Sequence, residues 1–197
     1  MNVKRIARSA APIFALLGGL GVQGCTGEDA AGHGDLSLSV SGGAAVRDGF
    51  PHQEGSTTFA FADGWTLQFT KYIVSLGNIG LSDPGNGELT GRWDGLAVMD
   101  LKKSSSGSLD LTTLSGLTSI RHDLSFELRA PGTNADNRNA DASDYDLMAA
   151  NGWSLLQEGT AHHATKGKVR FRLGLPLQIH YYGCINGKDK TQGIAIE

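Results

Sequence analysis

The segment from Trp65 to Leu81, WTLQFTKYIVSLGNIGL, constrains the fold more than any other part of this 197-residue chain. Its apolar residues recur at every second position, which is the period of a β-strand with one buried face. The apolar phase changes after Lys71 and again after Gly77. A change of phase without a strong break predicts a bulge near Thr70 and Lys71 and a kink at Gly77. Such bends would let one long strand serve two sheets of a sandwich.

The same alternation recurs in other segments, most clearly from Val169 to Tyr181, where apolar side chains keep one phase. Pro176 lies inside this segment, so it has to occupy a sheet edge or a gap in the hydrogen-bond ladder. A turn over 165–168 would join this strand to a preceding one that begins at Trp153. The chain also has 28 glycines, many in turn-like contexts, which suits a fold with many reversals. We therefore expect an antiparallel β-sandwich.

One short helix interrupts this β-rich pattern. Ser143 is a suitable N-cap for a helix over 144–150, and Asn151 and Gly152 provide its stop signal. We expect residues 35–197 to form a single mainly β domain that contains this helix.

The N-terminal residues have the features of a secretory signal. Lys4, Arg5 and Arg8 precede an apolar run over 10–22, which is shorter than the roughly 20 residues of a membrane-spanning helix. The following sequence, V-Q-G-C, resembles the lipobox of bacterial lipoproteins, in which the cysteine is lipidated and becomes the first residue of the mature chain. We expect a lipoprotein signal peptide over 1–24 and lipidation at Cys25, with an ordinary cleaved signal peptide as the alternative.

The sequence around this cysteine also bears on location. Residues 19–24, GLGVQG, match the dinucleotide-binding pattern G-x-G-x-x-G, but no strand precedes them and no helix can start in TGEDAAGHG. The polar residues of 25–34 instead predict a flexible tether between lipid and domain. Thr26 follows the cysteine, where lipoproteins of the inner membrane usually carry Asp. We therefore expect an exported protein anchored to the outer membrane.

Charge and cysteine content limit the partners. Removal of residues 1–24 leaves 14 basic and 20 acidic residues, a formal net charge of −6. This balance argues against nucleic acid as a partner, because nucleic-acid binding requires a basic face. The chain has two cysteines, so lipidation of Cys25 leaves Cys184 without a partner in this chain. A disulfide between them is possible only if the lipobox interpretation is wrong.

Two sets of residues are candidate metal ligands. His180 and Cys184 are close in sequence, and an imidazole and a thiolate suit copper or zinc. His162 and His163 are neighbours on an expected strand, so their side chains should point to opposite faces. Ordinary surface histidines are the alternative, because the spacing matches no zinc-finger pattern.

Four aspartates in the polar segment around 131–146 are candidate calcium ligands. Carboxylate oxygens suit calcium, but the segment lacks the glycine and the terminal glutamate of an EF-hand. A solvated loop that leads into a helix N-terminus is the alternative. The four residues are Asp136, Asp141, Asp144 and Asp146.

Three segments resemble uncharacterised predicted lipoproteins of Gram-negative bacteria. The first, FADGWTLQFTKYIVSLGNIGLSD over 61–83, shares a D-G-W, a K-Y-x-V step and a G-N ending with them. The others are GWSLLQEGTA and the run from Phe171 to Cys184. The resemblance implies a β-rich exported lipoprotein with a further portion beyond Glu197 that carries a His-Gly-Asp-His-like motif, so this sequence is either truncated or a short relative.

A second, more distant similarity involves the strand YIVSLGNIGL over 72–81, which is similar to a strand of periplasmic copper-associated proteins of methanobactin operons. The similarity implies an exported β-rich protein with a connection to copper, and it transfers no metal ligand to this chain.

The sequence contains no G-x-S-x-G, H-E-x-x-H or P-loop motif of an enzyme. We expect a membrane-anchored, non-enzymatic β-domain facing the periplasm or the cell surface, which binds a protein, glycan or small ligand. The alternative is a lipoprotein that binds copper or zinc through His180 and Cys184.

Overall fold

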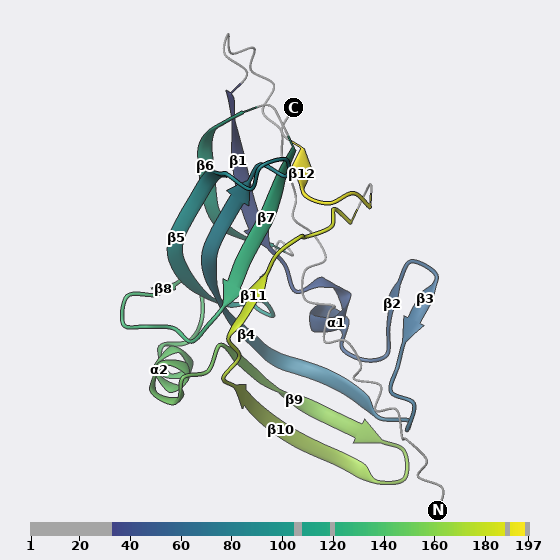
Figure 1. Ribbon diagram of the computed structural model, residues 1–197. Helices are drawn as coiled ribbons and strands as arrows, with labels where there is room; N and C mark the ends of the chain where they lie inside the picture. The colour runs from purple at the N-terminus through teal and green to yellow at the C-terminus, as the bar shows by residue number, and fades with distance from the viewer. Residues whose placement is uncertain (1–32, 105–107, 119–120, 188–189, 196–197) are drawn as a thin grey trace, which may run out of the picture.

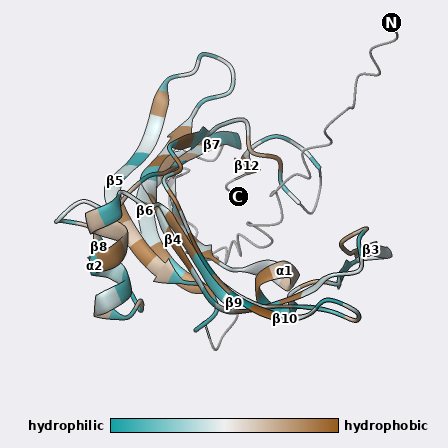
Figure 2. Cartoon of the chain, turned by 90° about the horizontal axis from the view of Figure 1, so that it is seen from below, coloured by the Kyte–Doolittle hydropathy of each residue, from teal (hydrophilic) through white to brown (hydrophobic). Residues whose placement is uncertain are grey.

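The computed structural model describes residues 33–104, 108–118, 121–187 and 190–195, and the lipidation site predicted at Cys25 lies outside these ranges. Within them the chain is mainly β, as expected, and its largest sheet has eight strands that curl strongly (Figures 1 and 2). All strand pairs of this sheet are antiparallel except β5–β8. The eight strands are β4 (Thr66–Ser82), β5 (Leu89–Asp100), β7 (Arg121–Leu128), β8 (Asp136–Asn137), β9 (Leu155–His163), β10 (Gly167–Leu175), β11 (Ile179–Tyr181) and β12 (Ile194–Ala195).

β4 is the 17-residue strand that joins the two halves of the curled sheet. On one side its first half pairs with β9 and its second half pairs with β7. The register shifts between Phe69 and Lys71 and again just after Gly77, and Asn78 has a φ of 48°. These are the bulge and the kink that the two phase changes in the sequence predict. The bends thus redirect a single strand between two sets of partners.

A smaller sheet packs on the inner face of the curled sheet. It consists of β1 (His33–Val40) and β6 (Leu109–Thr118) in antiparallel pairing. Its leucines share one buried cluster with apolar residues of β4, β5 and β7. The two sheets form unequal layers, and β1 already begins at His33, so 33 and 34 belong to a strand and not to the expected tether.

Two helices accompany the sheets in the described residues. α2 (Ala142–Asn151) contains the predicted helix over 144–150 and ends at Gly152, whose left-handed φ is 66°. Its N-cap is Asp141 and not the predicted Ser143. α2 lies outside the curl (Figure 2), where it buries Met148 against the outer face of the sheet. The six-residue α1 (Gly43–Asp48) was not expected from the sequence.

The segment expected as one strand over 169–181 is divided in the structure. β10 ends at Leu175, just before Pro176, and β11 pairs with β7 and not with β9. β9 and β10 form the expected hairpin, with Gly167 at a φ of 84° after the turn. β10 is an edge strand of the eight-stranded sheet (Figure 1). The short hairpin of β2 (His52–Glu54) and β3 (Thr57–Phe59) completes the described strands.

Candidate functional site

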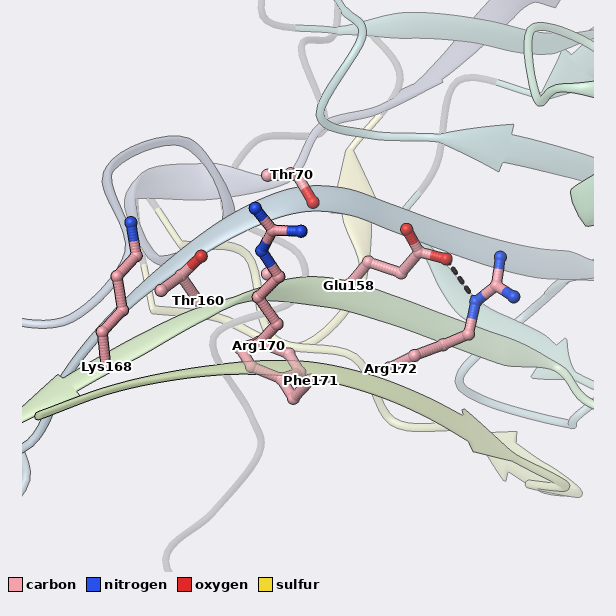
Figure 3. A pocket seen from close by; sticks show the side chains of 8 residues that line it. Thr70, Glu158, Thr160, Lys168, Arg170, Phe171 and Arg172 are labelled. Carbon is pink, nitrogen blue, oxygen red and sulfur yellow. Dashed lines mark hydrogen bonds and ion pairs between the residues drawn. The ribbon is translucent and has the colours of Figure 1, made fainter.

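A groove with a volume of about 670 Å³ lies on the outer face of β4, β9 and β10 (Figure 3). Side chains alternate between the faces of a strand, so Lys168, Arg170 and Arg172 of β10 lie in one row on this face. We call this hollow the cationic groove. Its lining residues are Thr70, Glu158, Gly159, Thr160, Lys168, Arg170, Phe171 and Arg172.

Close packing on the inner face holds together the three strands that carry the cationic groove. Gly159 lies opposite Phe69 of β4 and Phe171 of β10 in the strand register. A Cβ atom at Gly159 would lie 2.2 Å from the carbonyl oxygen of Gln68 and 2.8 Å from the ring of Phe171. Only glycine fits between the neighbouring backbone and this ring, which packs on the inner face, so the three strands can lie close together.

The charges of the groove are only partly neutralised. Arg172 forms ion pairs with Glu158 and, over 3.3 Å, with Asp144. Within the part of the chain that the structure describes, no ion pair involves Lys168 or Arg170. These two cations extend from the paired end of the row toward the hairpin turn (Figure 3). The groove therefore presents net positive charge on a chain whose formal net charge is negative.

An ion-pair network centred on the buried Asp144 connects this end of the groove to α2. The Asp144 carboxylate is almost fully buried, and the Lys71 ammonium donates a hydrogen bond to it over 2.5 Å. This hydrogen bond is the main cause that raises the pKa of Lys71. Asp141 receives Lys103 at 2.6 Å and Lys71 at 3.4 Å, and the hydrogen bond from Lys103 is the main cause that lowers the pKa of Asp141. The network fixes the position of Lys71 and the start of α2.

The four predicted calcium ligands do not gather around one open position. Asp141 and Asp144 come together, but on the Lys71 ammonium. Asp136 forms an ion pair with Arg138 at 2.8 Å. Asp146 is exposed on α2. Lys or Arg side chains of the protein therefore form ion pairs with three of the four carboxylates.

The adjacent histidines are separated as the strand pattern predicts. His162 is exposed on the outer face, opposite Lys168 in the strand register. The Nε2 of His163 lies 3.0 Å from the carbonyl oxygen of Asp63, and its Nδ1 accepts the backbone N–H groups of Thr165 and Lys166. This arrangement makes Nε2 the protonated nitrogen of His163. Nδ1 thus holds the hairpin turn, and Nε2 ties the turn to the segment before β4.

His180 and Cys184 lie on and after β11. His180 is largely exposed, and its Nδ1 is 3.7 Å from a carboxylate oxygen of Glu127. Cys184 is half-buried beside the main core, and burial, followed by the charge of Asp123, raises the pKa of its thiol. In the described ranges, no three His, Cys, Asp or Glu side chains come together in a way that could hold a metal ion. Copper or zinc binding through these residues stays a prediction.

Two buried histidines were not singled out by the sequence. His122 is fully buried, with Nδ1 2.7 Å from the Thr90 hydroxyl and Nε2 3.0 Å from the carbonyl oxygen of Thr118. His52 stacks on Phe59 at the β2–β3 hairpin. His122 is held by Thr118, four residues away, and by Thr90 of β5, and this second contact follows only from the three-dimensional fold.

The cations of the groove were also missed, although a signal for them was present. The alternation that places Val169, Phe171 and Leu173 on one face of a strand places 168, 170 and 172 on the other. All three of these positions are Lys or Arg. The second face of the clearest strand pattern could therefore have predicted a basic row.

The chain matches no protein-family model, no curated protein and no solved structure. The helices of the described residues include none with the length and apolar character to cross a membrane.

Proposed function

We propose that the protein is an exported, lipid-anchored binding protein whose β-domain captures an anionic ligand in the cationic groove. The observation that carries this proposal is the pair Lys168 and Arg170, which lie side by side in the groove on β10 without an ion pair among the described residues. Of the other exposed cations in the described ranges, Arg47, Arg92 and Arg138 form ion pairs and Arg129 and Lys166 do not, so it is the position of Lys168 and Arg170 together in a hollow that distinguishes them. Two adjacent unpaired cations in a hollow are the expected complement of an anion.

The chemistry of the two side chains defines the ligand class. A guanidinium group presents a planar fork of donors that fits a carboxylate or a phosphate with two hydrogen bonds, and an ammonium group adds a compact charge. Thr70 and Thr160 line the same groove and offer hydroxyl groups beside them. We infer a role in binding, since the open face formed by β4, β9 and β10 provides positive charge and hydroxyl donors.

The anchor rests on the sequence over 1–25. Lipidation at Cys25 would hold the domain at a membrane facing the periplasm or the cell surface, with the outer membrane as the expected location. Replacement Cys25→Ser should move the full chain from the membrane fraction to the soluble fraction in a Gram-negative host. Unchanged fractionation would contradict lipidation at Cys25 but would leave the proposal of anion binding in the cationic groove standing.

Binding to inorganic polyphosphate tests the groove. The full chain, purified in detergent, should bind polyphosphate in isothermal titration calorimetry. The variant Lys168→Gln/Arg170→Gln should bind about tenfold more weakly, since exposed ion pairs contribute up to about 1 kcal/mol each. The matched control is Arg129→Gln/Lys190→Gln, which removes the same charge at two exposed positions outside the groove. Equal losses in both variants, or no binding by the wild type, would refute the proposal.

A further inference from the structure

β10 is a long edge strand with an open backbone side. In the described part of the chain it pairs with β9 alone, at the end of the sheet order. Its nine residues include no proline, and its register with β9 has no bulge. An edge strand leaves the N–H and C=O groups of alternate residues directed away from the sheet, where another strand can pair with them. The opposite edge offers no such length, because β8 has two residues.

Both faces of β10 are accessible, and they differ in character. On the inner face, Val169 and Leu173 are 51% and 49% exposed. On the outer face, Lys168 and Arg170 are exposed and lack ion pairs among the described residues. A strand added beside β10 would therefore meet apolar side chains on one face and cations on the other.

This pattern disfavours a second copy of the same chain as the added strand. Pairing β10 with β10 in phase would place the basic residues 168, 170 and 172 of one copy beside those of the other. Like charges on neighbouring strands are destabilising. A shift by one residue would instead move the apolar row onto the charged face. The basic row thus acts against self-pairing while it leaves the edge open.

We propose that β10 binds an extended acidic segment of another protein by β-strand addition. The segment carries Asp or Glu at every second position and apolar residues between them. Its backbone completes the hydrogen-bond ladder of β10, its carboxylates face Lys168 and Arg170, and its apolar residues cover Val169 and Leu173. This inference rests on the proposed function, because the cationic groove supplies the charge, and it identifies the ligand as a polypeptide strand.

Peptides of the same length as β10 test the inference on the full chain in detergent. The probe alternates glutamate and valine. The first control has the same composition with its glutamates grouped at one end, and the second is the alternating peptide with N-methylated backbone amides. The alternating peptide should bind at least about tenfold more tightly than either control. Its binding should also slow the hydrogen exchange of alternate amides over 167–175, measured by NMR.

A charge reversal provides the matched protein variant. Lys168→Glu/Arg170→Glu changes two exposed side chains, so the fold should persist. This variant should no longer bind the glutamate–valine peptide and should bind an alternating lysine–valine peptide. That exchange of preference would not follow from a merely structural role of the two residues.

The outcomes separate this inference from the proposed function. Polyphosphate binding together with equal affinity for all three peptides would overturn strand addition and leave anion binding intact. Peptide binding without a change in the exchange of β10 amides would also overturn it. Dimerisation of the wild type through β10, detected by sedimentation, would overturn the proposal, because the added strand would then be a second copy of this chain. Failure to bind both polyphosphate and peptide would overturn the two proposals together.

Discussion

The buried carboxylate of Asp144 provides a sharp test of what stabilises the outer face. The variant Asp144→Asn keeps the shape of the side chain and removes its charge. The side chain of Asp144 is 2% exposed and lies 2.5 Å from Lys71 Nζ and 3.3 Å from an Arg172 nitrogen. The substitution leaves the Lys71 ammonium beside a neutral amide. It also removes a negative charge from the first turn of α2, where the helix dipole favours one.

The expected loss follows from the exposure of the partners. Removal of one member of a fully buried ion pair costs about 3–5 kcal/mol. Lys71 is 25% exposed and keeps Asp141 at 3.4 Å, and the asparagine amide still accepts a hydrogen bond. We therefore expect a lower value, with the free energy of unfolding reduced by about 2 kcal/mol.

Urea unfolding followed by circular dichroism measures this loss. The midpoint should fall while the slope with denaturant stays the same, because the surface exposed on unfolding does not change. The matched control is Asp146→Asn on the same helix, which is exposed and should change the free energy of unfolding by less than about 0.5 kcal/mol. A double-mutant cycle with Lys71→Met should give a coupling energy of about 1–2 kcal/mol. If Asp144→Asn is no more harmful than Asp146→Asn, the network does not stabilise the fold.

Two further predictions concern titrating groups. Burial raises the pKa of Tyr72 to about 12. The unfolded chain loses this proton near pH 10 and the folded chain near pH 12, so the free energy of unfolding should fall between these pH values. Tyr72→Phe should reduce this fall in urea titrations, with part remaining from Tyr181, whose pKa burial also raises. A full-sized fall in that variant would contradict the assignment. In a Cys25→Ser background, the Cys184 thiol should react slowly with Ellman's reagent near pH 8 and rapidly in urea, because burial raises its pKa. Asp123→Asn should speed the folded-state reaction by roughly threefold, since it removes the nearby charge, and an unchanged rate would exclude that influence.

Local features of this fold could be predicted from the sequence. The bulge and the kink of β4 could be predicted because a change of apolar phase is a local sequence pattern. A change of phase requires a shift of strand register if the apolar side chains are to stay on the buried face. The hairpin of β9 and β10 followed from alternation and a turn. A gap in the ladder was one of the two positions expected for Pro176, but the change of partner from β9 to β7 was not predicted, because Leu175, Leu177 and Ile179 keep their phase through the break in pairing. Phase reports the face of a residue and not its partner strand.

Features that depend on distant contacts could not be predicted. In the sequence Asp144 is a candidate calcium ligand or a residue of a helix N-terminus, whereas the fold places Lys71 and Arg172 around it. The same applies to the contact of His163 with Asp63, to which its Nε2 donates, whereas its Nδ1 accepts within its own turn. Pairing of a charged or aromatic side chain is decided by which strands become neighbours, and single-sequence patterns do not carry that information.

The position of β4 also determines the order in which the fold can be completed. Over 66–72 its main partner is β9, which is synthesised long after β4 itself. Until 155–163 is available, this half of β4 has a vacant side, and loop closure over such a separation is slow. We therefore expect the β4–β5 hairpin to form early and the β9–β10 hairpin to dock last. During synthesis, a strand of another protein could therefore pair with the open side of β4. After the β9–β10 hairpin has docked, β10 is the edge strand instead.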